Sequence, residues 1–415
     1  MTRQTVRYAL LSLPSMIALA NSGHASADFL ADSKASLELR NMYMNRDFRQ
    51  SSAPATQEDW GQGFTLRAQS GFTEGVVGFG VDAMAQLGVK LDSTPRNSGT
   101  GVLAVNTSGE PEDSWSELGL TAKARLANST LRLGTLQPVL PVVMYNDTRL
   151  LSSAFNGGML TSDKDIPGLT LNAGRLNQVN QRDSSSWDDL SFVYNGAQSD
   201  HFSFAGGAYD LLDNLSASYY YGKLDNIYDQ HFLGLVNTLP LADKISLRTD
   251  LRYFRNSDSG EGLGGKIDND TIMGMLTLSV GAHKFGAAYQ QMSGDGNFPF
   301  LAGGDPYSVN LVTYNTFGKA DTDAWQLRYD YDFASLGIPG LSFMTRYVNG
   351  SDIDTPVVSN GKEWERDTDL AYVIQDGSLK GLNVRWRNVT FRSGNGLTND
   401  LDENRLIIGY TLPLW

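Results

Sequence analysis

Apolar and polar residues alternate strictly along several long stretches of the chain. In the stretch 77–91 every odd position carries valine, phenylalanine, alanine or leucine, whereas Asp82, Gln86 and Lys90 lie on the opposite side. A period of two that is sustained over eight to fifteen residues predicts β-strands. The same alternation recurs in three further stretches, at 117–126, 324–333 and 405–414.

These predicted strands are longer than strands of soluble proteins, which average about five or six residues. A tilted strand that crosses a membrane needs about nine to eleven residues. The apolar faces also end in aromatic residues, as at Tyr329, Tyr331, Tyr410 and Trp415, which is typical of an interfacial girdle. Charged residues on the opposite face require water, and a closed barrel with a wet lumen supplies it without leaving an edge in lipid. We therefore predict a transmembrane antiparallel β-barrel.

The alternatives are a soluble sandwich and an exported β-helix. A sandwich does not need apolar faces this long, and the short internal repeat expected of a β-helix is not visible in the sequence.

The connections between the predicted strands alternate between short and long. The residues at 72–75, 127–130 and 336–340 suit tight turns. Short turns at one end and long loops at the other are typical of outer-membrane barrels. The chain length suits about 18 strands, with sixteen as an alternative. The long polar connections are expected at 92–113, 135–167, 256–269, 293–307 and 350–368.

The first 27 residues are predicted to be a secretory signal peptide. Arg3 and Arg7 precede a short apolar stretch at 8–20, and Ala25-Ser26-Ala27 supplies a cleavage site before Asp28. An uncleaved anchor helix is the alternative, but this apolar stretch is too short to span a bilayer. We expect residues 28–415 to form one outer-membrane β-barrel domain.

Composition excludes several classes of function. The chain has no cysteine, which rules out disulfides, zinc knuckles, iron–sulfur clusters and thiol nucleophiles, and it has only 4 histidines. With 46 acidic and 33 basic residues the formal net charge is −13, which argues against a nucleic-acid partner. No cofactor is expected. A barrel hydrolase remains a distant alternative, because no G-x-S-x-G motif or triad pattern is present. The acid pairs Asp268/Asp270, Asp352/Asp354 and Asp400/Asp402 are interpreted as solvated loop acids, with calcium binding as the alternative.

Arginines recur on the polar faces of the predicted strands. Arg385 and Arg387 alternate with Val384 and Trp386, so both project to one side about 7 Å apart. Arg405 enters this face from the following strand, and no acid lies between Arg385 and Arg387 on their strand face. Guanidinium groups bind carboxylates bidentately and in plane. We therefore expect these arginines to line a track for anions.

Other basic residues of the polar faces stand alone and have two interpretations. Arg67 and Arg125 are candidates for the anion track, but a single arginine is more often ion-paired with an acid of the lumen. The candidate acids are Glu38, Asp82, Glu117 and Asp330. Arg392 would need a β-bulge near Asn388 to face inward.

The segment 140–162 is too apolar for an exposed loop. We expect it to fold into the barrel, to narrow the pore and to place Arg149 at the constriction, with Val142, Met144, Leu150, Leu151 and Phe155 against the wall. The alternative is a loop that packs on its neighbours outside the barrel.

Several short motifs run in order through the whole mature chain, at 28–30 (DFL), 39–41 (LRN), 45–47 (NRD), 148–150 (TRL), 210–217 (DLLDNLSA), 337–350 (GIPGLSFMTRYVNG) and 403–407 (ENRLI). Together these motifs resemble the OprD-like porin family, the substrate-specific outer-membrane carboxylate channels of pseudomonads.

The resemblance implies an 18-stranded monomeric pore with an inward-folded third loop and a ladder of basic residues that guides carboxylates. The sequence itself leaves a loose trimer as the alternative to a monomer. The rungs of this ladder map onto Arg385, Arg387 and Arg405, the loop arginine onto Arg149, and first-strand members onto Arg40 and Arg46. An electronegative counter-pocket maps onto Asp305 with Tyr307 beside it.

The compact loops look more like the branch that takes up cyclic or aromatic monocarboxylates, such as benzoate-type compounds, by passive diffusion. A channel for basic amino acids or peptides is the alternative within the family. The expected partners are outer-membrane lipid, lipopolysaccharide, the barrel-assembly machinery and the substrate itself.

Overall fold

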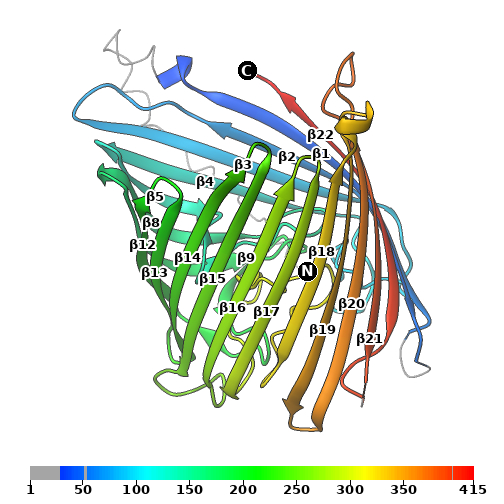
Figure 1. Ribbon diagram of the computed structural model, residues 1–415. Coiled ribbons are helices and arrows are strands. Elements are labelled where there is room, and N and C mark those ends of the chain that lie inside the picture. The colour runs from blue at the N-terminus through cyan, green and yellow to red at the C-terminus, as the bar shows by residue number, and fades with distance from the viewer. Residues whose placement is uncertain (1–28, 51–53, 395) are drawn as a thin grey trace, which may run out of the picture.

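A computed structural model describes residues 29–50, 54–394 and 396–415 (Figure 1). The signal peptide predicted for residues 1–27 lies outside the described residues. Within the described part, eighteen antiparallel strands close into a barrel. They are β1 (Lys34–Phe48), β2 (Thr56–Gln69), β3 (Val77–Asp92), β4 (Ser114–Leu126), β5 (Ser129–Leu136), β8 (Ala154–Ile166), β9 (Leu169–Asn180), β12 (Phe202–Leu212), β13 (Leu215–Leu224), β14 (Tyr228–Ala242), β15 (Ile245–Asp258), β16 (Asp268–Val280), β17 (His283–Asp295), β18 (Asp323–Asp332), β19 (Leu341–Thr355), β20 (Val358–Val373), β21 (Asn383–Ser393) and β22 (Leu401–Pro413).

The first and last strands pair and thereby close the sheet. The register of β1 and β22 runs without interruption from Ser36 opposite Pro413 to Phe48 opposite Leu401. Closure leaves no open sheet edge, which is the condition for placing a sheet in hydrocarbon. The remaining short strands lie in loops: β6 (Val139–Leu140) pairs with β7 (Val143–Met144), and β10 (Trp187–Ser191) pairs with β11 (Gln198–Ser199).

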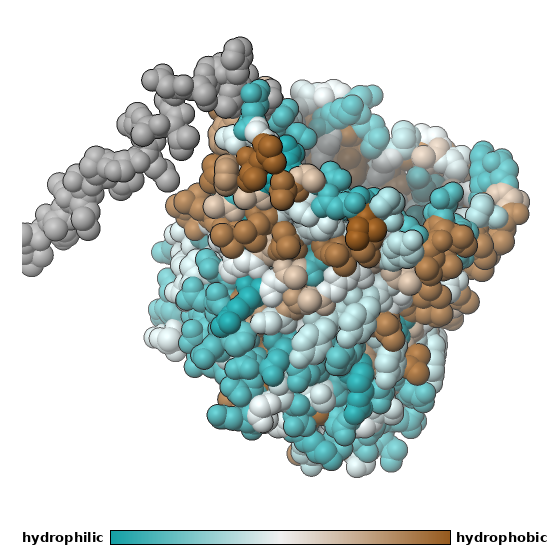
Figure 2. All heavy atoms as spheres, turned by 90° about the vertical axis from the view of Figure 1, so that its left-hand side faces the viewer, coloured by the Kyte–Doolittle hydropathy of each residue, from teal (hydrophilic) through white to brown (hydrophobic). Residues whose placement is uncertain are grey.

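The barrel presents its apolar side chains outward. Phe79 on β3 is 58% exposed and Leu118 on β4 is 70% exposed, whereas Gln86 and Glu117 of the same strands are buried inside. Figure 2 shows apolar side chains gathered in a band across the upper part of the wall, with hydrophilic side chains over the lower part. This arrangement is the reverse of that in a soluble protein and suits a wall that faces lipid. The predicted faces are therefore confirmed. No helix among the described residues has the length and apolar character needed to cross a membrane.

One end of the barrel carries short turns and the other carries long loops. The turns expected at 72–75, 127–130 and 336–340 all lie at the short-turn end, which is uppermost in Figure 1. At 333–340 the chain passes through a short 3-10 helix, η1 (Phe333–Leu336), and Gly337 follows with φ of 82°, a conformation that favours glycine. The long-loop end carries the second loop (93–113), the third loop (137–153), the fourth loop (181–201) and the seventh loop (296–322).

Three of the expected loop boundaries were wrong. The segment 135–167 contains β8, and 350–368 contains the ends of β19 and β20, which are joined by only residues 356 and 357. The ends of β19 and β20 extend beyond the apolar band, where polar residues predominate and the alternation disappears. β8, by contrast, is part of the wall and exposes Leu160 and Ile166. The loop expected at 293–307 is longer than predicted and continues to residue 322.

The long loops fold inward and pack on three apolar clusters inside the barrel. One cluster joins Met42 and Met44 of β1 to Leu103 of the second loop and Leu150 of the third loop. The largest cluster lines the far wall and includes Phe155, Phe202, Phe232, Phe254 and Phe298. The smallest joins Val312 and Phe317 of the seventh loop to Ala324 and Val348 of the wall. The loops are therefore held in the lumen by the same hydrophobic burial that stabilises a soluble core.

Candidate substrate pathway

The third loop lies inside the barrel, as its apolar sequence predicted, rather than outside. It spans 137–153 and not 140–162, because Phe155 belongs to the wall strand β8. Val142 and Leu151 are buried and Leu150 is only 2% exposed, whereas Met144 is half-buried. Gly63 of β2 makes room for the loop: a Cβ atom there would lie 2.9 Å from the carbonyl oxygen of Leu150.

Arginines of the wall fix the tip of the third loop. Arg40 of β1 forms an ion pair with Asp147 at 2.7 Å and donates to the carbonyl oxygen of Arg149 at 2.7 Å. Arg405 of β22 is 1% exposed and donates to the carbonyl oxygens of Thr148 and, at 2.9 Å, of Thr313 in the seventh loop. Arg40 and Arg405 therefore lie at the constriction, where they position two loops.

The seventh loop is held by a row of buried carboxylates on β20. Glu365 accepts hydrogen bonds from the backbone N–H groups of Tyr314 and Asn315, both at 2.8 Å. Glu363 forms an ion pair with Lys319 at 2.6 Å. Thr313 donates through its hydroxyl to Asp367 at 2.9 Å, and Arg346 of β19 contacts the same carboxylate at 2.6 Å.

Sequence reasoning missed this acidic row. Glu363, Glu365, Asp367 and Asp369 alternate with other residues over 363–369, so their period of two places all of them on the lumen face of β20. The signal is the same one that identified the arginines, and it was available in the sequence.

Arg387 is neutralised by this acidic row. Its Nε and Nη2 atoms each donate to a carboxylate oxygen of Asp369, both at 2.6 Å. The prediction that Arg385 and Arg387 face no acid is therefore wrong for Arg387. The acid comes from the neighbouring strand, where Asp369 lies opposite Arg387 in the register. Arg385 is exposed, and among the described residues it has no ion-pair partner.

The bulge considered near Asn388 is absent. The pairing of β21 with β20 and with β22 continues without a register shift from Asn383 to Phe391. Arg392 consequently falls on the outward-facing side of β21, where it forms an ion pair with Asp402 at 3.0 Å.

A chamber of about 290 Å³ opens between the third, fourth and seventh loops. Its charged lining residues are Arg149, Arg182, Asp183 and Asp305. Its apolar lining comes from Val193, Phe300, Pro306, Leu311 and Val312. The chamber thus combines a few polar groups with an apolar wall, which is the usual composition of a small-molecule site.

Arg149 has no acidic partner among the described residues. Its side chain is 8% exposed and donates only to uncharged oxygens, at 3.2 Å to the carbonyl of Thr100 and at 3.0 Å to the carbonyl of Thr148. Burial, together with the nearby charges of Arg405 and Arg182, lowers the pKa of Arg149 well below its usual value. A buried positive charge among like charges is stabilised by any anion that enters.

Arg182 of the fourth loop, like Arg149, forms no ion pair with an acid among the described residues. It donates from Nη1 to the hydroxyl of Thr148 at 3.1 Å, but its Nε atom is buried and has no hydrogen-bond partner. Burial lowers its pKa. Arg182 was missed in the sequence because a loop residue follows no strand periodicity.

Asp305 connects the seventh loop to the third. Its Oδ1 atom accepts a hydrogen bond from Asn146 at 2.7 Å, and its backbone N–H donates to the carbonyl oxygen of Met144 at 2.9 Å. Burial raises the pKa of Asp305 to about 6, against the opposing effect of the Arg182 and Arg149 charges.

The other predicted site residues lie away from the chamber. Arg46 forms an ion pair with Glu403 at 2.6 Å. Arg67 contacts Glu38 at 3.1 Å, and Arg125 stacks on Phe72 of a short turn, 4.2 Å from the ring centroid. Tyr307 packs against the guanidinium group of Arg252 at 3.9 Å, so its ring fixes the seventh loop to the wall.

The barrel, the inward-folded third loop and the narrow polar pathway define an outer-membrane porin. A family model described as "outer membrane porin, OprD family" matches residues 27–414, and the chain belongs to this family. Porin D of Pseudomonas aeruginosa is 38% identical over 413 residues and covers 93% of this chain and 92% of its own length.

Two solved structures from Pseudomonas aeruginosa show the same barrel. OpdQ is 53% identical, with a TM-score of 0.85 over 94% of this chain and 100% of the other. OpdK, solved with vanillate, is 37% identical, with a TM-score of 0.89 over 93% of this chain and 100% of the other. The chain is thus a non-enzymatic channel of the outer membrane for the uptake of small molecules. Its long-loop end accordingly faces the exterior and its short-turn end the periplasm.

Proposed function

We propose that this porin takes up small monocarboxylates with a compact apolar body, such as benzoate-type compounds. The observation that carries the proposal is the pair Arg149, which is buried, and Arg182, which is half-buried with a buried Nε atom that has no hydrogen-bond partner. Neither guanidinium group forms an ion pair with any acid among the described residues. A carboxylate that enters the chamber supplies the missing counter-charge.

The rest of the chamber supports an apolar substrate body. Phe300, Pro306 and Val312 offer a wall for a ring, and a volume of about 290 Å³ suits a molecule of that size. The vanillate-bound structure of OpdK shows that a relative at 37% identity accommodates an aromatic carboxylate.

The alternative, a channel for basic amino acids, requires a site for a cation. Asp305 is the best candidate, but burial raises its pKa to about 6 and its carboxylate already accepts a hydrogen bond from Asn146. Arg149 and Arg182 also repel a cation from the same chamber. Asp183 also lines the chamber, so its two acids balance the formal charges of the two arginines. The preference for an anion therefore rests on the buried Arg149, which forms no ion pair, and on the Nε atom of Arg182, which has no hydrogen-bond partner.

Transport is passive, and the binding must be weak enough for release. Arg149 and Arg182 offset part of the desolvation cost of the carboxylate when it leaves bulk water. Arg405 and Arg387 have their own acids in Glu403 and Asp369. These ion pairs prevent the wall from becoming a deep trap for anions.

The test is single-channel recording in planar bilayers at pH 7, with benzoate, benzamide and arginine titrated separately. Benzamide has the ring of benzoate without its charge. We expect concentration-dependent current interruptions with benzoate and none with benzamide or arginine. Interruptions by arginine alone, or equal interruptions by benzoate and benzamide, would refute the proposal.

A further inference from the structure

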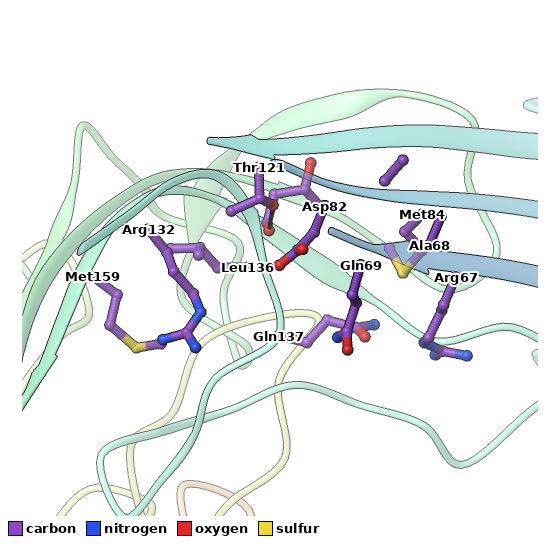
Figure 3. A pocket seen from close by; sticks show the side chains of 12 residues that line it. Arg67, Ala68, Gln69, Asp82, Met84, Thr121, Arg132, Leu136, Gln137 and Met159 are labelled. Carbon is purple, nitrogen blue, oxygen red and sulfur yellow. Dashed lines mark hydrogen bonds between the residues drawn. The ribbon is translucent and has the colours of Figure 1, made fainter. Parts of the chain in front are cut away.

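A second hollow lies on the periplasmic side of the third loop, against the inner wall of β2 to β5 and β8 (Figure 3). It has a volume of about 320 Å³ and shares no lining residue with the chamber. Gln69 is the last residue of β2, and Arg132 is the fourth residue of β5, shortly after the turn that joins β4 to β5. The hollow therefore lies toward the short-turn end. A substrate that has passed the third loop reaches this hollow on its way to the periplasm.

The charges of the hollow leave one arginine without a counter-charge. Asp82 is occupied by Lys123 at 2.6 Å, and Arg67 contacts Glu38 at 3.1 Å. The side chain of Arg132 has no ion pair and no hydrogen bond to any residue that the structure describes. The acids near the hollow are therefore engaged elsewhere, and the guanidinium group of Arg132 keeps its donors for a ligand.

Amide and apolar side chains complete the hollow. The side-chain amide of Gln69 has no hydrogen bond within the described part of the chain, and Figure 3 shows it between Arg132 and Arg67. Gln137 is held in place, because its Nε2 atom donates to the hydroxyl of Ser152 at 2.8 Å. The larger apolar lining residues are Met84, Leu136 and Met159, and Figure 3 shows Met159 beside Arg132 and Met84 at the opposite end of the hollow.

We propose that this hollow is a second carboxylate site, in series with the chamber, in which Arg132 and Gln69 bind the carboxylate and the methionines contact the apolar body of the substrate. This proposal rests on the proposed function and extends it to residues on a different wall. Arg132 lies on β5, whereas Arg385, Arg387 and Arg405 lie on β21 and β22. Two weak sites on different walls favour onward movement over trapping.

The absence of native cysteine allows a direct test of occupancy. Met159→Cys places a unique thiol in the hollow, and Met344→Cys places one on the lumen face of β19, across the barrel. The measurement is the rate at which an uncharged maleimide modifies each thiol, with and without benzoate. At a benzoate concentration ten times the dissociation constant of the hollow, we expect modification of Met159→Cys to slow by about tenfold. The rate for Met344→Cys should not change.

A second substitution assigns the protection to Arg132. Adding Arg132→Gln to Met159→Cys should abolish the protection, whereas adding Lys164→Gln should leave it intact. Lys164 is a matched control because it carries the same charge at the same end of the barrel, in a surface ion pair with Asp210 outside the hollow. The heat-dependent shift of the barrel in gel electrophoresis verifies folding. If the Arg132 variant does not fold, Gln69→Leu replaces it and should also reduce the protection.

Three outcomes would overturn the second site: no protection of Met159→Cys, equal protection of both thiols, or protection that persists in folded Arg132→Gln. These outcomes differ from failure of the proposed function. If benzoate interrupts the wild-type current but does not protect Met159→Cys, only the second site fails. If benzoate neither interrupts the current nor protects the thiol, both proposals fail.

Discussion

Replacing Arg149 by glutamine tests the chamber most sharply. The substitution removes one positive charge at a residue that has no acidic partner among the described residues, so it leaves no acid unpaired. It also relieves repulsion with Arg405 and Arg182, which offsets part of the loss of hydrogen bonds to Thr100 and Thr148. We therefore expect the barrel to remain folded with its heat-dependent gel shift unchanged.

The expected effect on binding follows from the value of a charge-assisted hydrogen bond. Such a bond contributes about 1.5–3 kcal/mol, and about 1.4 kcal/mol corresponds to a tenfold change in affinity. The Arg149→Gln channel should therefore bind benzoate about 10- to 100-fold more weakly. Titration of benzoate in single-channel recordings measures this change as a shortening of each current interruption.

The matched control removes a charge pair instead of a free charge. Arg387→Gln combined with Asp369→Asn eliminates the bidentate ion pair of the wall and keeps the net charge of the lumen unchanged. We expect the affinity of this double variant for benzoate to stay within about threefold of wild type. Unchanged binding in Arg149→Gln, or an equal loss in the control, would refute the assignment of binding to the chamber.

Three further perturbations address the chamber, the seventh loop and the third loop. Because the pKa of Asp305 is about 6, lowering the pH from 7.5 to 5.5 protonates this carboxyl and removes a negative charge from the chamber. As the pH is lowered, the benzoate dissociation constant measured in bilayers should therefore decrease in wild type but not in Asp305→Asn. A wild-type dissociation constant that does not change with pH would contradict this. Glu365→Gln weakens the acceptor of the Tyr314 N–H, so brief fluctuations of the open-channel current should become more frequent, and an unchanged current trace would argue against this latch. Gly63→Val adds side-chain atoms at a position where a Cβ alone would lie 2.9 Å from the carbonyl oxygen of Leu150, so the third loop should move into the pore and lower the conductance; a wild-type conductance would speak against this packing.

The barrel wall could be predicted from the sequence because the membrane imposes its pattern on every strand. In β3 each odd position faces lipid and each even position faces the lumen, so the alternation over 77–91 gives the strand, its length and its orientation. The same reasoning fails where a strand leaves the apolar band. Residues 350–368 are mostly polar and show no sustained apolar alternation, and the ends of β19 and β20 were consequently mistaken for a loop.

The chamber could be predicted only in part. Arg149 was found because its loop is too apolar to be exposed, and Arg405 was found by strand parity. The partner of Arg387 depends on the register of β20 and β21, which places Asp369 opposite it and which no local pattern reveals. Arg182 lies in the fourth loop, where only the folded structure shows which side chains reach the lumen.

The most direct test of the central claim is a crystal structure of the porin with 4-iodobenzoate, located by the anomalous signal of iodine. We predict a ligand in the chamber between the third, fourth and seventh loops, with its carboxylate within hydrogen-bond distance of Arg149 or of the Nε atom of Arg182. An ordered ligand that makes no contact with either arginine, or an empty chamber at a concentration that saturates the current interruptions, would contradict the claim.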